Sequence, residues 1–336
     1  MGDAYAPSLS GLKKITGILD RVDSRLDIEP VTNYLRAGVQ FAFQNLEEAQ
    51  ALISKSPYPS EILYSDFFKG GNTYKNPNTT LCLQNNDFKL SNFFKVYFDD
   101  LPFKLRNENI PLLIFSCDMK YFEFFAENLV DSIMKSGFYS DLLFFIIEDE
   151  NSQNDVIVSK IRYKLKNIGR ELYIIKASLI KNEMPALAAS GRYLIAKDVI
   201  NRTGQGVFIF DIDFEFKAEM LNDLKKAVAT NSIALTINKY GRNIYPWATI
   251  PAATAFIPNN EAGKVLLDIF SLYIQNNFRE EGGNWWIDQN ALFAGYNYIR
   301  KYYPQTQILD LVGVRNAGAT NGEDDVKQFK RQTESR

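Results

Sequence analysis

The residues with the clearest chemical potential lie in the segment VFIFDIDFEFK, residues 207–217, where an apolar run leads into two aspartates. Asp211 and Asp213 stand two positions apart, and in a β-strand such residues point to the same side. Two carboxylates held side by side repel each other, and burying them without a partner is strongly unfavourable. We therefore expect a positively charged group between them.

The amino-acid composition narrows the choice of metal and of catalyst. The 336-residue chain contains no histidine, which removes Ser-His and Cys-His catalysis together with the imidazole ligands of metal ions. A metal ion must then be held by oxygen atoms, which favours Mg²⁺ or Mn²⁺. General acid–base chemistry falls to Asp, Glu, Lys or Tyr.

Charge and cysteine content exclude further classes. The formal net charge is −2, so the chain carries no electrostatic footprint of nucleic-acid binding. Cys82 and Cys117 lie far apart in the sequence and indicate neither a zinc finger nor a disulfide framework, which fits a reducing compartment. The start MGDAYAPSLSGLKK lacks a secretory signal, and the apolar run DLLFFII is too short to span a bilayer. We expect a cytoplasmic protein, with peripheral membrane contact left open.

Apolar runs alternate with helical periodicity from residue 110 onward. The patterns predict strands at 110–118, 141–150, 171–178 and 207–216 and helices at 119–137, 156–169 and 184–204. This alternation, with strands apolar on both faces, predicts an α/β fold with a mainly parallel sheet flanked by helices. In such sheets ligands bind beyond the carboxyl ends of the strands, where Ser116, Asp118 and the two aspartates fall.

The rest of the chain suggests three parts. Helices are predicted at 218–230, 260–278 and 287–303, and strands at 232–238 and 253–258. Residues 30–56 have helical spacing, whereas 57–109 are rich in Pro, Asn, Gly and aromatic residues and give no firm assignment. We expect a helical or irregular N-terminal extension over 1–109, a main domain over 110–313 and a mobile tail over 314–336. Homodimerisation, acceptor binding and docking on other proteins all stay open as roles of the extension.

Four stretches, IPLLIFSCDMKYFEFFAENLVDSI, ASGRYLIAKDVI, VFIFDIDFEF and GGNWWIDQNALF, together resemble GT-A-fold glycosyltransferases in order and spacing. The resemblance covers residues 110–310 and implies a metal-dependent transfer of a sugar from a nucleotide-sugar donor, UDP- or GDP-linked, to a sugar, glycan or protein acceptor. Asp211 and Asp213, the D-x-D motif of such enzymes, would hold Mn²⁺ or Mg²⁺ on the donor diphosphate. The cation would stabilise the departing phosphates.

The resemblance also suggests donor-binding residues in the preceding elements. Arg192 is expected near the diphosphate or the sugar, with an ordinary helix-surface arginine as the alternative. Ser116 and Asp118 are candidates for contacts to the nucleoside, although Asp118 could equally cap the helix that follows it.

The acceptor side is expected around GGNWWIDQNAL and the loop that contains Trp247. Asp288 would orient or deprotonate an acceptor hydroxyl, or else cap its own helix. Gln289 accompanies it through the resemblance alone. The rings of Trp247, Trp285 and Trp286 would stack on sugars, or else pack in a core.

Two departures keep alternatives open. Glycogenin-like members of the fold supply a later histidine to the metal, so here Asp310, Asp288 or water would fill that position, and both inverting and retaining transfer stay open. A haloacid-dehalogenase-type phosphatase would also use D-x-D, with a Thr or Val soon after it, whereas Phe214 follows the motif here, and the acidic pair Asp324–Asp325 lies in the tail. A binding or scaffold protein without turnover is the non-enzymatic alternative.

Overall fold

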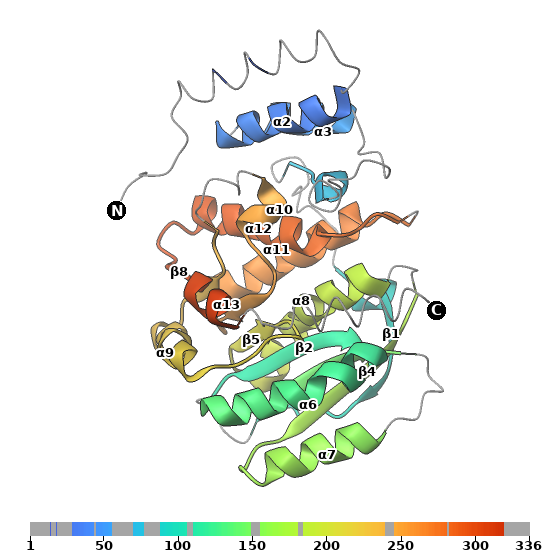
Figure 1. Ribbon diagram of the computed structural model, residues 1–336, viewed down its shortest axis with the longest axis vertical. Coiled ribbons are helices and arrows are strands. Elements are labelled where there is room, and N and C mark those ends of the chain that lie inside the picture. Colours follow the sequence, from blue (N-terminus) through green and yellow to red (C-terminus); the bar gives the residue numbers. More distant parts are fainter. Residues whose placement is uncertain are drawn as a thin grey trace. The chain divides into compact units, whose positions relative to one another are not determined.

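A computed structural model describes residues 14, 18, 29–43, 45–55, 70–76, 88–105, 110–148, 155–180, 184–238, 245–280 and 282–318 (Figure 1). The chain divides into two compact units. The first comprises residues 1–88, 237–251 and 268–302, and the second comprises 89–236, 252–267 and 303–336. Because each unit is built from separate stretches of the chain, the expected division at residue 109 does not match this partition.

The second unit is built on one sheet, in which the described residues form eight strands in the order β1-β4-β3-β2-β5-β7-β6-β8. The central strands β4, β3, β2 and β5 run parallel to one another, and β6 runs parallel to β8. β1 pairs antiparallel with β4, and β7 is antiparallel to both β5 and β6. The strands are β1 (Phe94–Asp99), β2 (Leu112–Asp118), β3 (Leu142–Ile147), β4 (Leu172–Leu179), β5 (Val207–Phe210), β6 (Ile233–Leu235), β7 (Thr254–Ile257) and β8 (Ile308–Asp310). The prediction of an α/β fold with a helix-flanked, mainly parallel sheet is confirmed.

Helices cover both faces of this sheet. α6 (Met119–Ser136), α7 (Asp155–Lys166), α9 (Leu221–Thr230) and α13 (Val312–Gly318) contribute to one large apolar cluster together with every second strand residue, such as Phe115 and Phe144. The intervening residues Ser116 and Phe145 face α8 (Met184–Thr203) on the opposite side. A short turn of 3₁₀-helix, η3 (Ala218–Met220), precedes α9, and η2 (Leu90–Asn92) precedes β1.

Local sequence signals set the limits of α6. The side chain of Asp118 accepts a hydrogen bond of 2.8 Å from the backbone N–H of Tyr121 and so caps the start of the helix. Gly137 ends it in the left-handed conformation, at φ 78°, which glycine adopts without the Cβ clash of other residues. Burial of eight α6 side chains then fixes the helix on the sheet.

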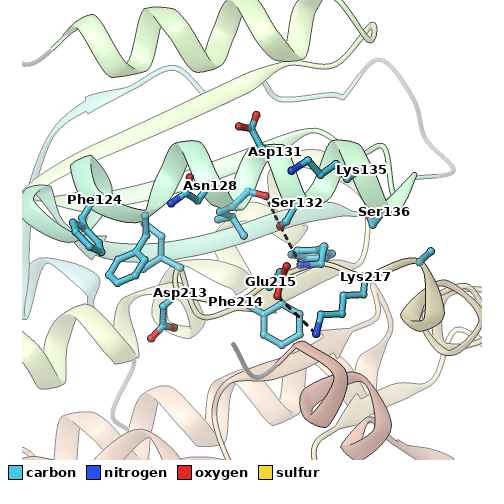
Figure 2. A pocket seen from close by; sticks show the side chains of 15 residues that line it. Phe124, Asn128, Asp131, Ser132, Lys135, Ser136, Asp213, Phe214, Glu215 and Lys217 are labelled. Carbon is cyan, nitrogen blue, oxygen red and sulfur yellow. Dashed lines mark hydrogen bonds and ion pairs between the residues drawn. The ribbon is translucent and has the colours of Figure 1, made fainter. Parts of the chain in front are cut away.

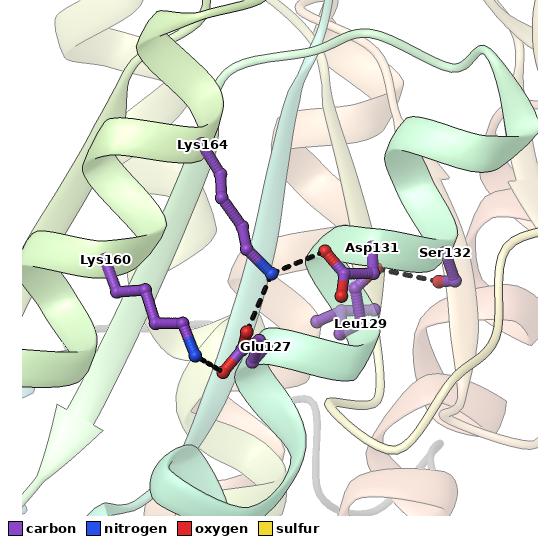
Figure 3. A network of polar contacts seen from close by, with 6 residues as sticks. All are labelled: Glu127, Leu129, Asp131, Ser132, Lys160 and Lys164. Carbon is purple, nitrogen blue, oxygen red and sulfur yellow. Dashed lines mark hydrogen bonds and ion pairs between the residues drawn. The ribbon is translucent and has the colours of Figure 1, made fainter.

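Ion pairs tie α6 to α7 at the surface (Figure 3). Lys164 Nζ lies 2.8 Å from Glu127 Oε1 and 2.7 Å from Asp131 Oδ1, and Lys160 Nζ lies 2.6 Å from Glu127 Oε2. Both lysines lower the pKa of Glu127 because they stabilise its charged form. For Lys164, burial acts to lower the pKa, but Asp131 and Glu127 raise it overall.

The first unit has its own aromatic core. Its elements are α2 (Glu29–Ala42), α3 (Leu46–Lys55), η1 (Gly70–Thr73), α10 (Pro246–Thr249), α12 (Ile287–Tyr302) and the larger part of α11 (Glu261–Asn277). Tyr34, Phe41, Tyr74, Tyr245 and Trp247 pack together in this core. The Tyr34 ring leaves no room beside Gly71, where an added Cβ would lie 2.5 Å from it.

The ends of the expected main domain differ in the structure. β1 begins at Phe94 and joins the sheet, so the sheet takes in part of what was expected to be the N-terminal extension. At the other end α13 continues to Gly318, and Val314 is fully buried, so the folded chain runs beyond the expected boundary at 313. Residues 319–336 of the expected tail lie outside the described residues.

Within the described ranges, no helix combines the length and the apolar character that crossing a bilayer requires.

Candidate functional site

The order of the strands singles out one position at the carboxyl ends of the sheet strands. From β2 the chain moves outward to β3 and β4, and it then returns to the other side of β2 to form β5. In open α/β sheets, ligands bind at the carboxyl ends of the strands where the order reverses in this way. In this sheet that position lies between the ends of β2 and β5, and Ser116, Asp118 and Asp211 all lie at these ends.

The D-x-D segment forms a turn and does not continue the strand. β5 ends at Phe210, and the backbone N–H of Phe214 donates a 3.3 Å hydrogen bond to the Asp211 carbonyl oxygen. The prediction of a strand to residue 216 was therefore wrong. The orientation of the two carboxylates is set by this turn and not by the two-residue period of a strand. The aromatic core is the physical reason, because the rings of Phe214 and Phe216 turn inward to lie 4.9 and 4.7 Å from the ring of Phe210.

Alternate residues of this turn nevertheless differ in exposure. Ile212, Phe214 and Phe216 are buried, at 5%, 6% and 3% exposure. Asp211 and Asp213 between them are partly exposed, and so is Glu215, which the sequence analysis did not single out. The strict alternation of apolar and acidic residues in FDIDFEF was the signal that could have identified Glu215.

Arg192 and Asp211 form an ion pair at this edge. Arg192 Nη2 lies 2.6 Å from Asp211 Oδ1, and the same nitrogen donates a 3.1 Å hydrogen bond to the carbonyl oxygen of Ala252. The Arg192 side chain is only 4% exposed, whereas that of Asp211 is 35% exposed. Because an isolated buried guanidinium is very unfavourable, Asp211 serves first as its counter-ion.

The position of Arg192 follows from the burial of α8. Residues 190–196 of this helix are all buried, so its one arginine in that stretch cannot lie on a solvated surface. The alternative of an ordinary helix-surface arginine is therefore wrong. The contact of Arg192 with a donor phosphate remains a prediction. In the structure, Arg192 orients Asp211 through their ion pair.

Ser116 lies beneath α8, close to its backbone. A Cβ on Gly191 would stand 2.5 Å from Ser116 Oγ and 2.8 Å from Phe145 Cδ1, so the helix approaches the strand closely only because residue 191 is glycine. The Ser116 hydroxyl is buried and has no hydrogen-bond partner, which is unusual for a buried polar group. Its expected contact with a nucleoside stays a prediction. Asp118 has the capping role that the sequence left open as its alternative.

Asp213 opens on a hollow that lies along α6. The hollow has a volume of about 700 Å³ and is lined by residues 124–136 of α6 on one side and by residues 212–218 on the other. Figure 2 shows Asp213 near Phe124, with Lys135 and Lys217 toward the opposite end. We call this hollow the α6 groove. The sequence analysis did not anticipate it, because its two walls are more than 70 residues apart.

The two carboxylates alone do not complete the ligand set of a metal ion, so a substrate and water would have to supply the remaining ligands. No group of three or more Asp, Glu, His or Cys side chains among the described residues could hold a metal ion. Asp310, considered for a third position, accepts a 2.9 Å hydrogen bond from the backbone N–H of Val312. Mg²⁺ is commonly bound by one or two carboxylates together with substrate phosphates and water, so Asp213, with or without Asp211, would have to share the cation with a ligand.

The first unit contains the residues expected on the acceptor side. Asp288 lies in the first turn of α12, is 7% exposed, and accepts a 2.8 Å hydrogen bond from the backbone N–H of Gln289. The Gln289 side-chain oxygen is buried and has no hydrogen-bond partner. The roles of Asp288 and Gln289 toward an acceptor remain predictions.

The three tryptophans differ in their environment. Trp247 is fully buried and stacks on Tyr245, with ring centroids 5.0 Å apart, so the core alternative describes it and neither indole face is open to a sugar. Trp286 packs against the same core and has a positive φ of 70°, a conformation that is rare outside glycine. Trp285 is 41% exposed and is the one of the three that could stack on a ligand.

The comparisons with known proteins add little. No protein-family model matches the sequence, and no curated protein matches it. One similar solved structure is the crystal structure of the glycosyltransferase GlyE in Streptococcus pneumoniae TIGR4, at 22% identity and a TM-score of 0.36. The match covers 60% of this chain and 46% of that chain, so this chain spans less than half of that protein's length. A TM-score this low leaves the likeness without weight for the function of this chain.

Proposed function

We propose that this protein is a metal-dependent glycosyltransferase that takes its sugar from a nucleotide-sugar donor. The observation that supports the proposal best is the position of the D-x-D turn at the carboxyl end of β5, where the strand order reverses. A divalent cation that bridges a diphosphate suits this position, because Asp213 lies at one end of the hollow and Asp211 is fixed by Arg192.

The residues of the second unit have distinct roles in this proposal. Asp213, which lines the hollow, is the carboxylate that we propose to contact the cation, while Asp211 shares its charge between the cation and Arg192. Arg192 is a positioning residue, because its side chain is buried and it acts through Asp211. A bound Mn²⁺ or Mg²⁺ would supply Lewis-acid stabilisation of the leaving diphosphate.

Two residues of the first unit have proposed roles toward the acceptor. Asp288 is the proposed residue that orients or deprotonates the acceptor hydroxyl, and its buried carboxylate is held by the Gln289 N–H. Trp285 offers an exposed ring for stacking. UDP- and GDP-sugars are the donors that we propose to test first.

The phosphatase alternative fits the structure less well. The motif of such enzymes, D-x-D-x-T/V, has Thr or Val four positions after the first aspartate, and this chain has Glu215 there. The acidic pair Asp324–Asp325 falls outside the described residues.

A thermal-shift panel of nucleotide sugars tests the proposal. We expect at least one UDP- or GDP-sugar to raise the melting temperature in the presence of Mn²⁺ and not in the presence of a chelator. The Asp213→Asn variant should lose this shift, because it removes the carboxylate that faces the hollow. Asp223→Asn, an exposed acid on α9, is the matched control and should keep it. A metal-dependent shift that survives Asp213→Asn would contradict the proposed site.

A further inference from the structure

The α6 groove has a lining that the proposed donor site does not use. Its exposed side chains are Phe124, Asn128 and Lys135 on α6, and the partly exposed Glu215 and Lys217 lie on the opposite wall (Figure 2). The backbone of the second wall is fixed to the first, because the N–H of residue 216 donates a 3.0 Å hydrogen bond to Ser132 Oγ. The walls are therefore held in place before any ligand arrives.

Phe124 exposes a ring at one end of this groove. It is 42% exposed, and it packs edge-on against Phe125 with ring centroids 4.6 Å apart. Phe125 is 9% exposed and belongs to the apolar core, so it anchors the exposed ring. A fixed aromatic face of this kind offers a large contact area at little entropic cost, and it suits the apolar C–H face of a pyranose ring.

The polar groups next to the ring suit hydroxyl ligands. Asn128 lies four residues after Phe124 and so on the same side of α6, where its amide can both donate and accept hydrogen bonds. Glu215 lies across the groove and offers carboxylate oxygens as acceptors. Together these groups can satisfy the hydroxyls of a sugar whose ring stacks on Phe124.

The charges of the groove argue against a strongly charged ligand. Asp213 and Glu215 are matched by Lys135 and Lys217, and Lys217 Nζ lies 3.7 Å from Glu215 Oε2. The further acid, Asp131, is paired with a lysine of α7. A groove with balanced charge attracts neither a polyanion nor a polycation, and a neutral ligand fits it best.

From these features we propose that the α6 groove binds a neutral oligosaccharide, whose chain extends from the ring of Phe124 toward Lys217. Its end near Asp213 reaches the proposed metal-binding carboxylate, so the bound chain is the acceptor class of the proposed enzyme. The identification as acceptor rests on the proposed function, whereas the binding of the sugar chain does not.

Calorimetric titration of the full chain with neutral linear hexasaccharides of glucose, galactose, mannose and N-acetylglucosamine tests this inference. We expect at least one to bind, and Phe124→Ala to raise its Kd about tenfold through loss of the stacking surface. Asn128→Ala should raise the Kd about threefold to tenfold through loss of hydrogen bonds. Tyr163→Ala is the matched control, since Tyr163 is a 69% exposed aromatic residue on α7, outside the groove, and it should leave the Kd unchanged.

The outcomes separate this inference from the proposed function. Because Phe124 and Asn128 are exposed, both variants should keep the native melting temperature and the metal-dependent shift with the nucleotide sugar. If the nucleotide sugar binds but none of the hexasaccharides does, or if Tyr163→Ala weakens binding as much as Phe124→Ala, the groove inference is overturned and the proposed function stands. If a hexasaccharide binds through Phe124 without any nucleotide-sugar shift, the groove is a sugar site and the transferase proposal fails.

Discussion

The ion pair between Arg192 and Asp211 leads to an asymmetric prediction for the stability of the second unit. Asp211→Asn removes the carboxylate that lies 2.6 Å from the guanidinium of Arg192, whose side chain is 4% exposed. Arg192→Met leaves a carboxylate that is 35% exposed and can be hydrated. Removing the acid should therefore destabilise the protein more than removing the base, although the aspartate is the more exposed partner.

The magnitude follows from the burial of each partner. Breaking a fully buried pair by removing one side costs about 3–5 kcal/mol. Because Asp211 is partly exposed and Arg192 keeps its bond to Ala252, we expect about 2–4 kcal/mol for Asp211→Asn. For Arg192→Met we expect about 1–2 kcal/mol, from the lost hydrogen bonds. The double variant should be no less stable than Asp211→Asn alone, because the buried charge has gone.

Thermal melting of the three variants measures this prediction. At about 2–4 °C per kcal/mol, Asp211→Asn should lower the melting temperature by roughly 4–16 °C, and Arg192→Met by clearly less. An Arg192→Met variant less stable than Asp211→Asn, or a double variant whose losses simply add, would refute the reasoning. Because a change at Asp211 also disturbs the fold, Asp213 is the better position for tests of metal binding.

Three further predictions concern packing and pH. Gly191→Ala should destabilise the protein by about 1–3 kcal/mol, because the added Cβ would stand 2.5 Å from a serine oxygen. Gly313→Ala should be neutral or stabilising, because the nearest atom to its Cβ would lie at 3.5 Å. A denaturation series of the two variants measures this difference. Trp247→Ala should lower the stability by about 3–5 kcal/mol, because the ring is fully buried. Trp285→Ala should change the melting temperature little, because the residue is exposed. Equal losses of stability in the two variants would contradict the assigned environments. The pKa of Glu127 is lowered in the folded protein. The ionised Glu127 carboxylate therefore contributes to stability above its unfolded-state pKa, and this contribution is lost as the pH falls through its folded-state pKa. Glu127→Gln should abolish this part of the acid-side decline in melting temperature, and a decline identical in both proteins would count against the lysine contacts as its cause.

The parts of the fold that depend on local signals could be predicted from the sequence. The predicted strands at 110–118, 141–150 and 171–178 correspond to β2, β3 and β4, and the helix predicted at 119–137 corresponds to α6. Continuous apolar runs, the Asp118 cap and the Gly137 stop carry this information within a few residues. The same patterns also predicted the mainly parallel sheet.

Elements that depend on distant pairing could not be predicted. β1 has mostly exposed residues and is held at the sheet edge by antiparallel pairing with β4, which lies about 80 residues further along the chain. β8 is three residues long, and α13 has seven, so neither shows a usable period. Their stability comes from contacts that a single sequence does not display.

In the candidate site, too, local features could be predicted from the sequence and features set by distant contacts could not. The position of Asp211 and Asp213 at a strand end followed from the apolar run before them, but the turn that they form depends on the packing of Phe214 and Phe216 on the core. The partner of Arg192 could not be predicted either, because its need for a counter-ion arises only once α8 is buried on nearly all sides.

Release of nucleoside diphosphate from the nucleotide sugar that gives the largest thermal shift is the most direct test of the central claim. We expect slow release in Mn²⁺, loss of release with a chelator, and a decrease of at least about 100-fold in Asp213→Asn, while Asp223→Asn behaves as the native protein. Hydrolysis of p-nitrophenyl phosphate with no release from any nucleotide sugar, or release that persists in Asp213→Asn, would contradict the claim that this D-x-D turn supports sugar transfer.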